Sequence, residues 1–108
     1  MTELDAVAAD SGIPQGLRDM ARLRAALLLV DTGSYADVSS RIEAMAVDGN
    51  ALRHSAREAL GLAAWKEGKA GDALKLFAQI AEDDQAPQNI RQRASLMSEL
   101  IRGSGDAS

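Results

Sequence analysis

His54 and Ser55 are the one place in the sequence where a side-chain base lies next to a hydroxyl nucleophile. Hydrolytic chemistry needs an orienting acid for the base and, at a nucleophile elbow, flanking glycines. Neither accompanies this pair, and His54 stands near an expected helix start beside Arg53 and Arg57. A surface or helix-capping histidine is therefore the favoured interpretation.

Two other short motifs contain residue types that bind ions. Glu82-Asp83-Asp84 lacks the further oxygen ligands and the glycine spacing of a calcium loop, which favours an acidic helix end. Gly68-Lys69 lacks both the glycine five places earlier and the following Ser or Thr of a phosphate-binding loop, which favours a turn. We therefore expect a protein that is not an enzyme and that holds no metal and no cofactor.

The composition indicates a helical protein that does not bind nucleic acid. Ala and Leu dominate the 108 residues, aromatic residues make up only 3%, and no cysteine is present. Small and γ-branched side chains suit closely packed helices. A net charge of -4 opposes a phosphate backbone. The lack of cysteine is compatible with the cytoplasm or with the periplasm.

Helix-breaking residues divide the chain into segments of helical length. We expect one domain over residues 1–103, with helix hairpins at about 14–47 and 50–83, a C-terminal helix at about 87–102, and a flexible tail at 104–108. Leu4–Ala9 form a further short helical piece, which looks like the end of a helix whose hairpin partner lies upstream. Ser34, with Asp37 three residues later, is the expected N-cap of a helix. Short connections make consecutive helices antiparallel.

The sequence repeats itself internally. A shift of 73 positions places Pro14-Gln15 on Pro87-Gln88, and a shift of 35 places Gly33 on Gly68. Repetition at this period is typical of stacked helix hairpins.

Leu60-Gly61, Gly68, Ala73 and Phe77 have the spacing of the tetratricopeptide (TPR) signature, and the chain resembles TPR proteins on these residues. The preceding unit, Ala25-Ala26, Gly33, Val38 and Ile42, is a degenerate version of it. Arg22 and Arg57 depart from the signature, which often has Trp at these places. The resemblance implies an all-α fold of antiparallel helix hairpins in a right-handed superhelix, with about five helices and the short N-terminal piece.

A closer resemblance extends from about Leu4 to Gly105. The segments Arg18–Leu23, Arg53–Trp65 and Arg91–Ala94 are similar to the C-terminal half of the alphaproteobacterial relatives of the ancillary SecYEG translocon subunit (YfgM-like). This resemblance implies a periplasmic repeat domain of a membrane-anchored protein that hands secreted polypeptides from the Sec translocon to periplasmic chaperones. The longest apolar run, Ala25–Val30, is far shorter than the roughly 20 residues that span a bilayer. Membrane attachment would thus need an anchor that this chain does not contain. Without the resemblance, a cytoplasmic location is the default.

By analogy with TPR proteins, a second apolar side of the helices faces a groove that binds a protein or peptide. We expect this groove to contain Met20, Leu23, Leu27, Val30, Glu58, Leu62, Trp65, Lys66, Leu96 and Leu100. Arginines at the rim would bind carboxylates of the partner: Arg53, Arg57, Arg91 and Arg93. The alternative is self-association, in which a second copy of the chain or further repeats cover the same side, so that the protein is a homodimer or a larger assembly. Trp65 is the expected anchor of the groove.

Overall fold

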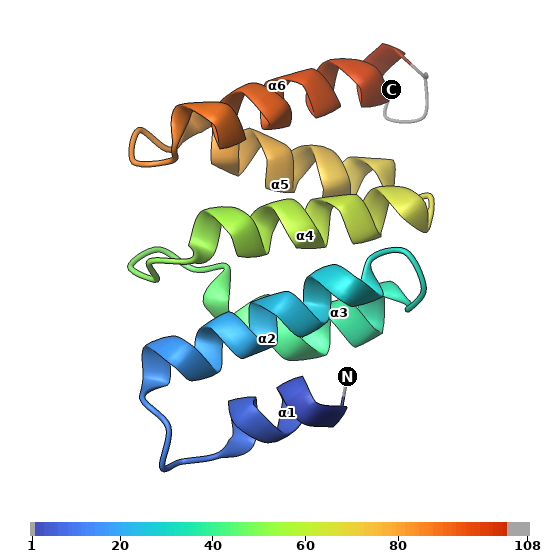
Figure 1. Cartoon of the computed structure of the whole chain (residues 1–108). Coiled ribbons are helices and arrows are strands. Elements are labelled where there is room, and N and C mark those ends of the chain that lie inside the picture. Colours follow the sequence, from blue (N-terminus) through green and yellow to red (C-terminus); the bar gives the residue numbers. More distant parts are fainter. Residues whose placement is uncertain (1, 104–108) are drawn as a thin grey trace.

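The computed structural model describes residues 2–103, and every regular element in this range is a helix. The elements are α1 (Thr2–Ala9), α2 (Gln15–Leu29), α3 (Tyr35–Ile42), the short 3₁₀ helix η1 (Glu43–Met45), α4 (Arg53–Lys66), α5 (Ala70–Glu82) and α6 (Gln88–Gly103). Consecutive α-helices run in opposite directions and stack along the long axis of the molecule (Figure 1). The predicted all-helical class is confirmed, and the predicted short N-terminal piece is α1. The predicted tail at 104–108 lies outside the described residues.

Local sequence signals set the ends of several helices. Ser34 caps α3 through a reciprocal capping box: its hydroxyl accepts a hydrogen bond from the Asp37 backbone N–H, and the Asp37 carboxylate accepts one from the Ser34 backbone N–H. Gly68 follows the end of α4 with φ of 80°, a left-handed conformation that favours glycine. The predicted roles of Ser34 and Gly68 are both confirmed.

The helices form a slab two helices thick. Alternate helices α2, α4 and α6 lie in one layer, in which α4 contacts both of its neighbours, and α3 and α5 lie behind them (Figure 1). The molecule measures 46 × 30 × 18 Å, and the smallest dimension corresponds to the two layers. Helix α1 packs on α2 at one end of the stack, and Asp5 reaches across to Arg41 of α3 at 2.9 Å. One broad side of the slab is thus made of three parallel helices.

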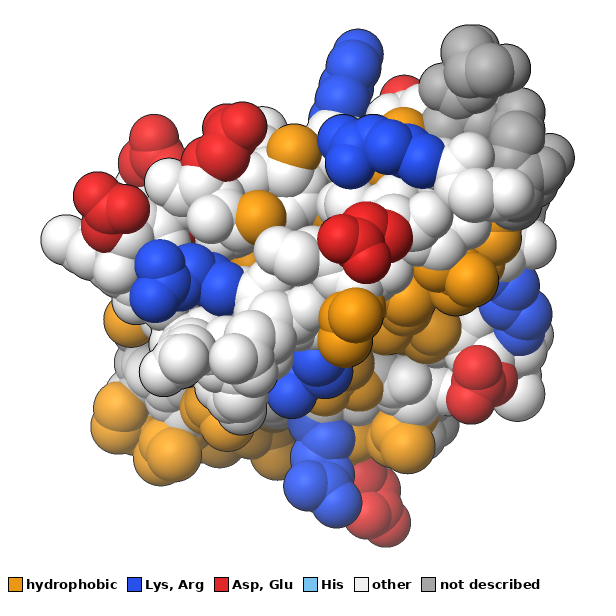
Figure 2. Space-filling model, turned by 90° about the horizontal axis from the view of Figure 1, so that it is seen from above, with side chains coloured by type: hydrophobic (Ala, Val, Ile, Leu, Met, Phe, Trp, Pro, Cys, Tyr) orange, Lys and Arg blue, Asp and Glu red, His pale blue; other side chains and the backbone are white. Residues whose placement is uncertain are grey.

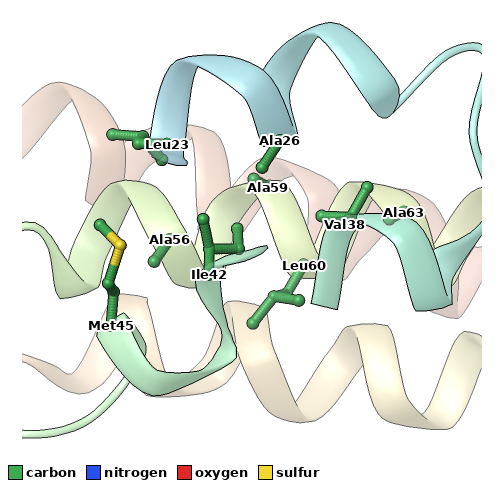
Figure 3. Packing of buried hydrophobic residues seen from close by; sticks show 9 residues of the cluster. All are labelled: Leu23, Ala26, Val38, Ile42, Met45, Ala56, Ala59, Leu60 and Ala63. Atoms are coloured by element: carbon green, nitrogen blue, oxygen red, sulfur yellow. The ribbon is translucent and has the colours of Figure 1, made fainter. Parts of the chain in front are cut away.

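The core consists of two neighbouring clusters joined through α4. The first cluster lies between α2, α3 and α4 (Figure 3), and its members are Leu23, Ala26, Val38, Ile42, Met45, Ala56, Ala59, Leu60 and Ala63. The second lies between α4, α5 and α6 and is centred on Phe77, Ile80, Ala94 and Ile101. Small alanines of α4 face both clusters, which allows helices on either side to approach it closely. Helix α4 is accordingly the most deeply buried element of the stack.

Gly61 and Phe77 form the closest approach between α4 and α5. A Cβ atom on residue 61 would lie 2.8 Å from Phe77 Cζ, closer than real carbon atoms approach. Phe77 is fully buried and is the largest such side chain in the described part of the chain. The glycine therefore provides the space for the ring.

Candidate protein-binding face

Eight large apolar side chains lie on the broad side made by α2, α4 and α6. We call this set the front face, because α2, α4 and α6 form the layer nearer the viewer in Figure 1. Its members are Leu17, Met20, Leu27 and Leu28 of α2, Leu62 and Trp65 of α4, and Leu96 and Leu100 of α6. Seen from above α6, hydrophobic side chains gather along the lower edge of the molecule, which is this same side (Figure 2).

The front face is most exposed on its two outer helices. The four residues of α2 are 47–60% exposed, and Leu96 and Leu100 of α6 are 65% and 59% exposed. In α6 these leucines lie opposite Ala94 and Ile101, which are buried against α5. Both helices are therefore apolar on two sides, and only one side of each is used by the fold.

Helix α4 contributes a flatter, partly covered strip between them. Leu62 and Trp65 are half-buried and pack against the second core cluster. Lys66, one residue further, is exposed. Part of the Trp65 side chain, the expected anchor, thus packs in the core, and Trp65 has a smaller exposed fraction than the leucines of α6.

Two residues expected in the groove belong to the core instead. Leu23 is only 6% exposed, and with Ala26, three residues later, it lies in the first cluster. Val30 caps the end of α2 and packs half-buried against the same cluster. One side of α2 turns toward α3 and α4, and along it lie Leu23, Ala26, Leu27 and Val30. Only Leu27 lies at the exposed edge of this side. Leu17 and Leu28 lie on the front face but were not among the predicted groove residues, although their spacing from Met20 and Leu27 indicates the same side of α2.

Glu58 and Arg93 do lie close together, but as partners of each other. Arg93 Nε donates to Glu58 Oε2 at 2.9 Å, and this pair joins α6 to α4. The Glu58 carboxylate raises the pKa of Arg93 through this hydrogen bond. Arg91 is half-buried, and its Nε atom has no hydrogen-bond partner in the described residues. The structure places neither Glu58 nor Arg91 as a free charge at the rim.

The prediction that Arg53 and Arg57 lie at the rim is wrong, because both form ion pairs within the fold. Arg57 lies three residues before Leu60 and therefore on the buried side of α4, with a side chain only 7% exposed. It donates to the Ala46 carbonyl at 3.1 Å and pairs with Asp48 at 2.9 Å and with Asp83 at 3.4 Å. Arg53 pairs with Asp83 at 2.9 Å. Both arginines join the start of α4 to the loops that precede α4 and α6.

Asp83 is the centre of this charged cluster. The hydrogen bond from the Arg53 guanidinium, followed by that from the Gln85 backbone N–H, lowers the pKa of Asp83 to about 2. His54 Nδ1 lies 3.6 Å from the same carboxylate. Burial, and then the charge of Arg53, lower the pKa of His54. The histidine therefore lies within a network of charged groups, in surroundings that favour its neutral form.

The expected surface position of His54 is wrong, because the side chain is buried between the start of α4 and Asp83. Its Nδ1 has no hydrogen-bond partner among the described residues. The acidic motif lies at the end of α5, as expected, and there Asp83 pairs with two arginines. Within residues 2–103 we find no group of His, Asp and Glu placed to hold a metal ion. The same helices include none long and apolar enough to cross a membrane.

Comparison of the chain with protein-family models, with curated proteins and with solved structures finds no match. The front face must therefore be interpreted from its own chemistry.

Proposed function

We propose that this chain is a non-enzymatic protein-binding module of the TPR-like type, which accepts apolar side chains of another polypeptide on its front face. The carrying observation is that six large apolar residues of α2 and α6, each close to half exposed or more, lie on one broad side of the molecule. Contiguous exposed apolar surface on a small domain marks a contact site. Binding would bury that surface, at about 25 cal/mol per Å² before the cost of ordering the partner.

Several features support the TPR-like part of the proposal. The close approach of Gly61 to Phe77, the left-handed Gly68 and the buried Ala73 occupy the places that the TPR signature assigns to them. The alternation of helices between two layers, with α4 touching both α2 and α6, is also what stacked hairpins require.

A narrower proposal rests on the family resemblance alone. In it, the chain is the periplasmic part of a membrane-anchored protein that receives secreted polypeptides near the Sec translocon and passes them to chaperones. Crosslinking in cells through a photoreactive residue at position 96 tests this setting. Adducts with translocon subunits or periplasmic chaperones are expected, and adducts with cytoplasmic proteins alone would contradict it.

Peptide binding tests the broader proposal directly. The probes are fluorescein-labelled amphipathic helical peptides with acidic, neutral and basic polar faces, and fluorescence anisotropy measures their binding. Replacing Leu96 and Leu100 with Ser is expected to weaken capture about tenfold or more, while circular dichroism shows unchanged helicity because both side chains are exposed. Trp65, the only tryptophan, gives a second signal through its emission.

Val47→Ser is the matched control. Val47 is 54% exposed, like the leucines of the front face, but it lies in the loop between η1 and α4. Its replacement is expected to leave peptide binding unchanged. Equal losses in the Val47 variant and in the α6 variant would contradict a binding site on the front face, and so would a complete lack of binding by the unaltered chain.

A further inference from the structure

The two outer helices of the front face have opposite charges beside their exposed leucines. Arg24 is exposed on α2, between Met20 and Leu27. Glu99 is exposed on α6, next to Leu100 and three residues after Leu96. Neither charge forms an ion pair within the described residues. Other ionic groups on or beside this side are the Glu58–Arg93 ion pair, Lys66 at the end of α4, and Asp31, which is exposed four residues after Leu27.

These charges also lie at nearly the same height along their helices. Helix α2 begins at Gln15 and α6 begins at Gln88, each directly after a proline. Counted from these starts, Leu27 and Leu100 occupy the same position, and Arg24 and Glu99 differ by two positions. At 1.5 Å per residue the offset is about 3 Å, which long side chains readily span. The α2 strip is therefore complementary to the α6 strip in both apolar surface and charge.

We propose that two copies of this chain cover each other's front faces, with α2 of each copy lying on α6 of the other. A two-fold axis parallel to the helices, passing through the middle of the face beside α4, produces this arrangement. Leu27 and Leu100 of opposite copies then meet, and Arg24 pairs with Glu99 of the second copy on both sides of the axis. The contact is isologous, as in most homodimers.

Arg24 and Glu99 favour this axis over the other face-to-face two-fold, although the axis also brings exposed Lys66 of α4 toward its own equivalent. An axis perpendicular to the helices would place α2 against α2 of the second copy in antiparallel fashion, and would bring Arg24 toward its own equivalent. Like charges across an interface are costly. The axis parallel to the helices instead places Arg24 of each copy beside Glu99 of the other. The contact concentrates on α2 and α6, because Leu62 and Trp65 of α4 are already half-buried.

The face is large enough for a stable dimer. The broad side of the slab measures 46 by 30 Å, a rectangle of about 1,400 Å². Specific interfaces bury roughly 800 Å² on each partner. The inference uses the same face as the proposed function, so a foreign polypeptide would have to displace the second copy.

Two charge-reversal variants test the arrangement, with molar mass measured by sedimentation equilibrium over a range of protein concentrations. The unaltered chain is expected to be a dimer. Arg24→Glu alone and Glu99→Arg alone each place two like-charged contacts in the interface and are expected to raise the dissociation constant about tenfold or more. An equimolar mixture of the two variants is expected to restore the dimer, because both contacts of the mixed dimer then join a Glu to an Arg.

Arg102→Glu is the matched control, since Arg102 is exposed on α6 but is turned away from Leu96 and Leu100 by helical spacing. It is expected to leave the dimer unchanged. A chain that is monomeric at every concentration would overturn the inference, and so would a dimer that Glu99→Arg leaves intact or a mixture that fails to associate. A monomer that still binds the amphipathic peptides would overturn only this inference, and a dimer that binds no peptide would overturn only the proposed function.

Discussion

Arg22 and Arg57, 35 positions apart in the sequence, each bind the backbone carbonyl at the end of the preceding short helical segment. Arg22 Nη2 donates to the Ala8 carbonyl at 3.2 Å, and Arg57 Nε donates to the Ala46 carbonyl at 3.1 Å. These are the two places where the TPR signature often has tryptophan. In this chain, the guanidinium binds carbonyl groups that a helix end leaves without a partner.

The two arginines differ in burial, which predicts unequal effects on stability. Arg57→Ala removes a cation whose side chain is 7% exposed and which binds Ala46, Asp48 and Asp83, so we expect a loss of roughly 2–3 kcal/mol. Arg22→Ala removes a side chain that is 31% exposed, and its loss is expected to be smaller, about 1 kcal/mol. Urea unfolding followed by circular dichroism measures both. Equal losses in the two variants would contradict the prediction that the more deeply buried arginine contributes more to stability.

Gly61→Ala is expected to destabilise the α4–α5 hairpin. The added methyl group would lie 2.8 Å from Phe77 Cζ, and the Phe77 side chain is fully buried. Overpacking of this kind costs about 1–3 kcal/mol. Gly71→Ala is the control within α5, because no atom lies within 4 Å of its Cβ position. We expect that change to stabilise the protein by about 0.4–1 kcal/mol in the same urea titration.

Ser34→Ala is expected to cost about 1 kcal/mol, because it removes half of the capping box that begins α3. Helix α3 has only 8 residues and depends strongly on its cap. Ser40→Ala, inside the same helix, is the control: its hydroxyl donates only to the Asp37 carbonyl of its own helix. Thermal unfolding should show a lower Tm for the first variant and little change for the second.

Acid is expected to destabilise the protein in two steps, with stability measured by urea unfolding across the pH range. The pKa of His54 is lowered from its ordinary value of 6.5, so the unfolded chain binds a proton first as pH falls below 6.5, and stability is lost from that point downward. The pKa of Asp83 is lowered from 3.8 to about 2, so its contribution is present above 3.8 and is lost as pH falls toward 2.

His54→Gln separates the two steps. In this variant, stability is expected no longer to depend on pH between 6.5 and the lowered pKa of His54. The loss of stability at lower pH that is due to Asp83 is expected to remain. Arg53, Arg57 and Asp48 are the other charged groups that face this cluster. A stability profile that stays flat from pH 7 to pH 5 in the unaltered chain would contradict the assignment to His54.

The helical fold was accessible from the sequence because its signals are local. Gly68, the Ser34–Asp37 cap and the apolar spacing around Phe77 each act within a few residues, and the structure confirms them. The apolar exposure of Leu96 and Leu100 also follows from helical spacing once the buried side of α6 is known.

The charged cluster was not accessible, because it depends on contacts far apart in the chain. Arg57 is buried, and it pairs with Asp48 and Asp83, which come from two different loops. Its spacing from Leu60 was a signal of burial, but an arginine without a known partner is usually assigned to the surface. Leu23 was misplaced for a related reason: α2 is apolar on nearly every side, so spacing alone does not separate its core side from its free side.

The slab geometry has a consequence for how the chain reaches its native state. The main packing contacts join helices that are adjacent in sequence, and the longer ones, α2 with α4 and α4 with α6, skip a single helix. Such a topology has low contact order. Only short loops must close before the burial of apolar side chains begins to offset the loss of chain entropy. Each hairpin can therefore fold on the one before it while synthesis continues, with no need to wait for the C-terminus.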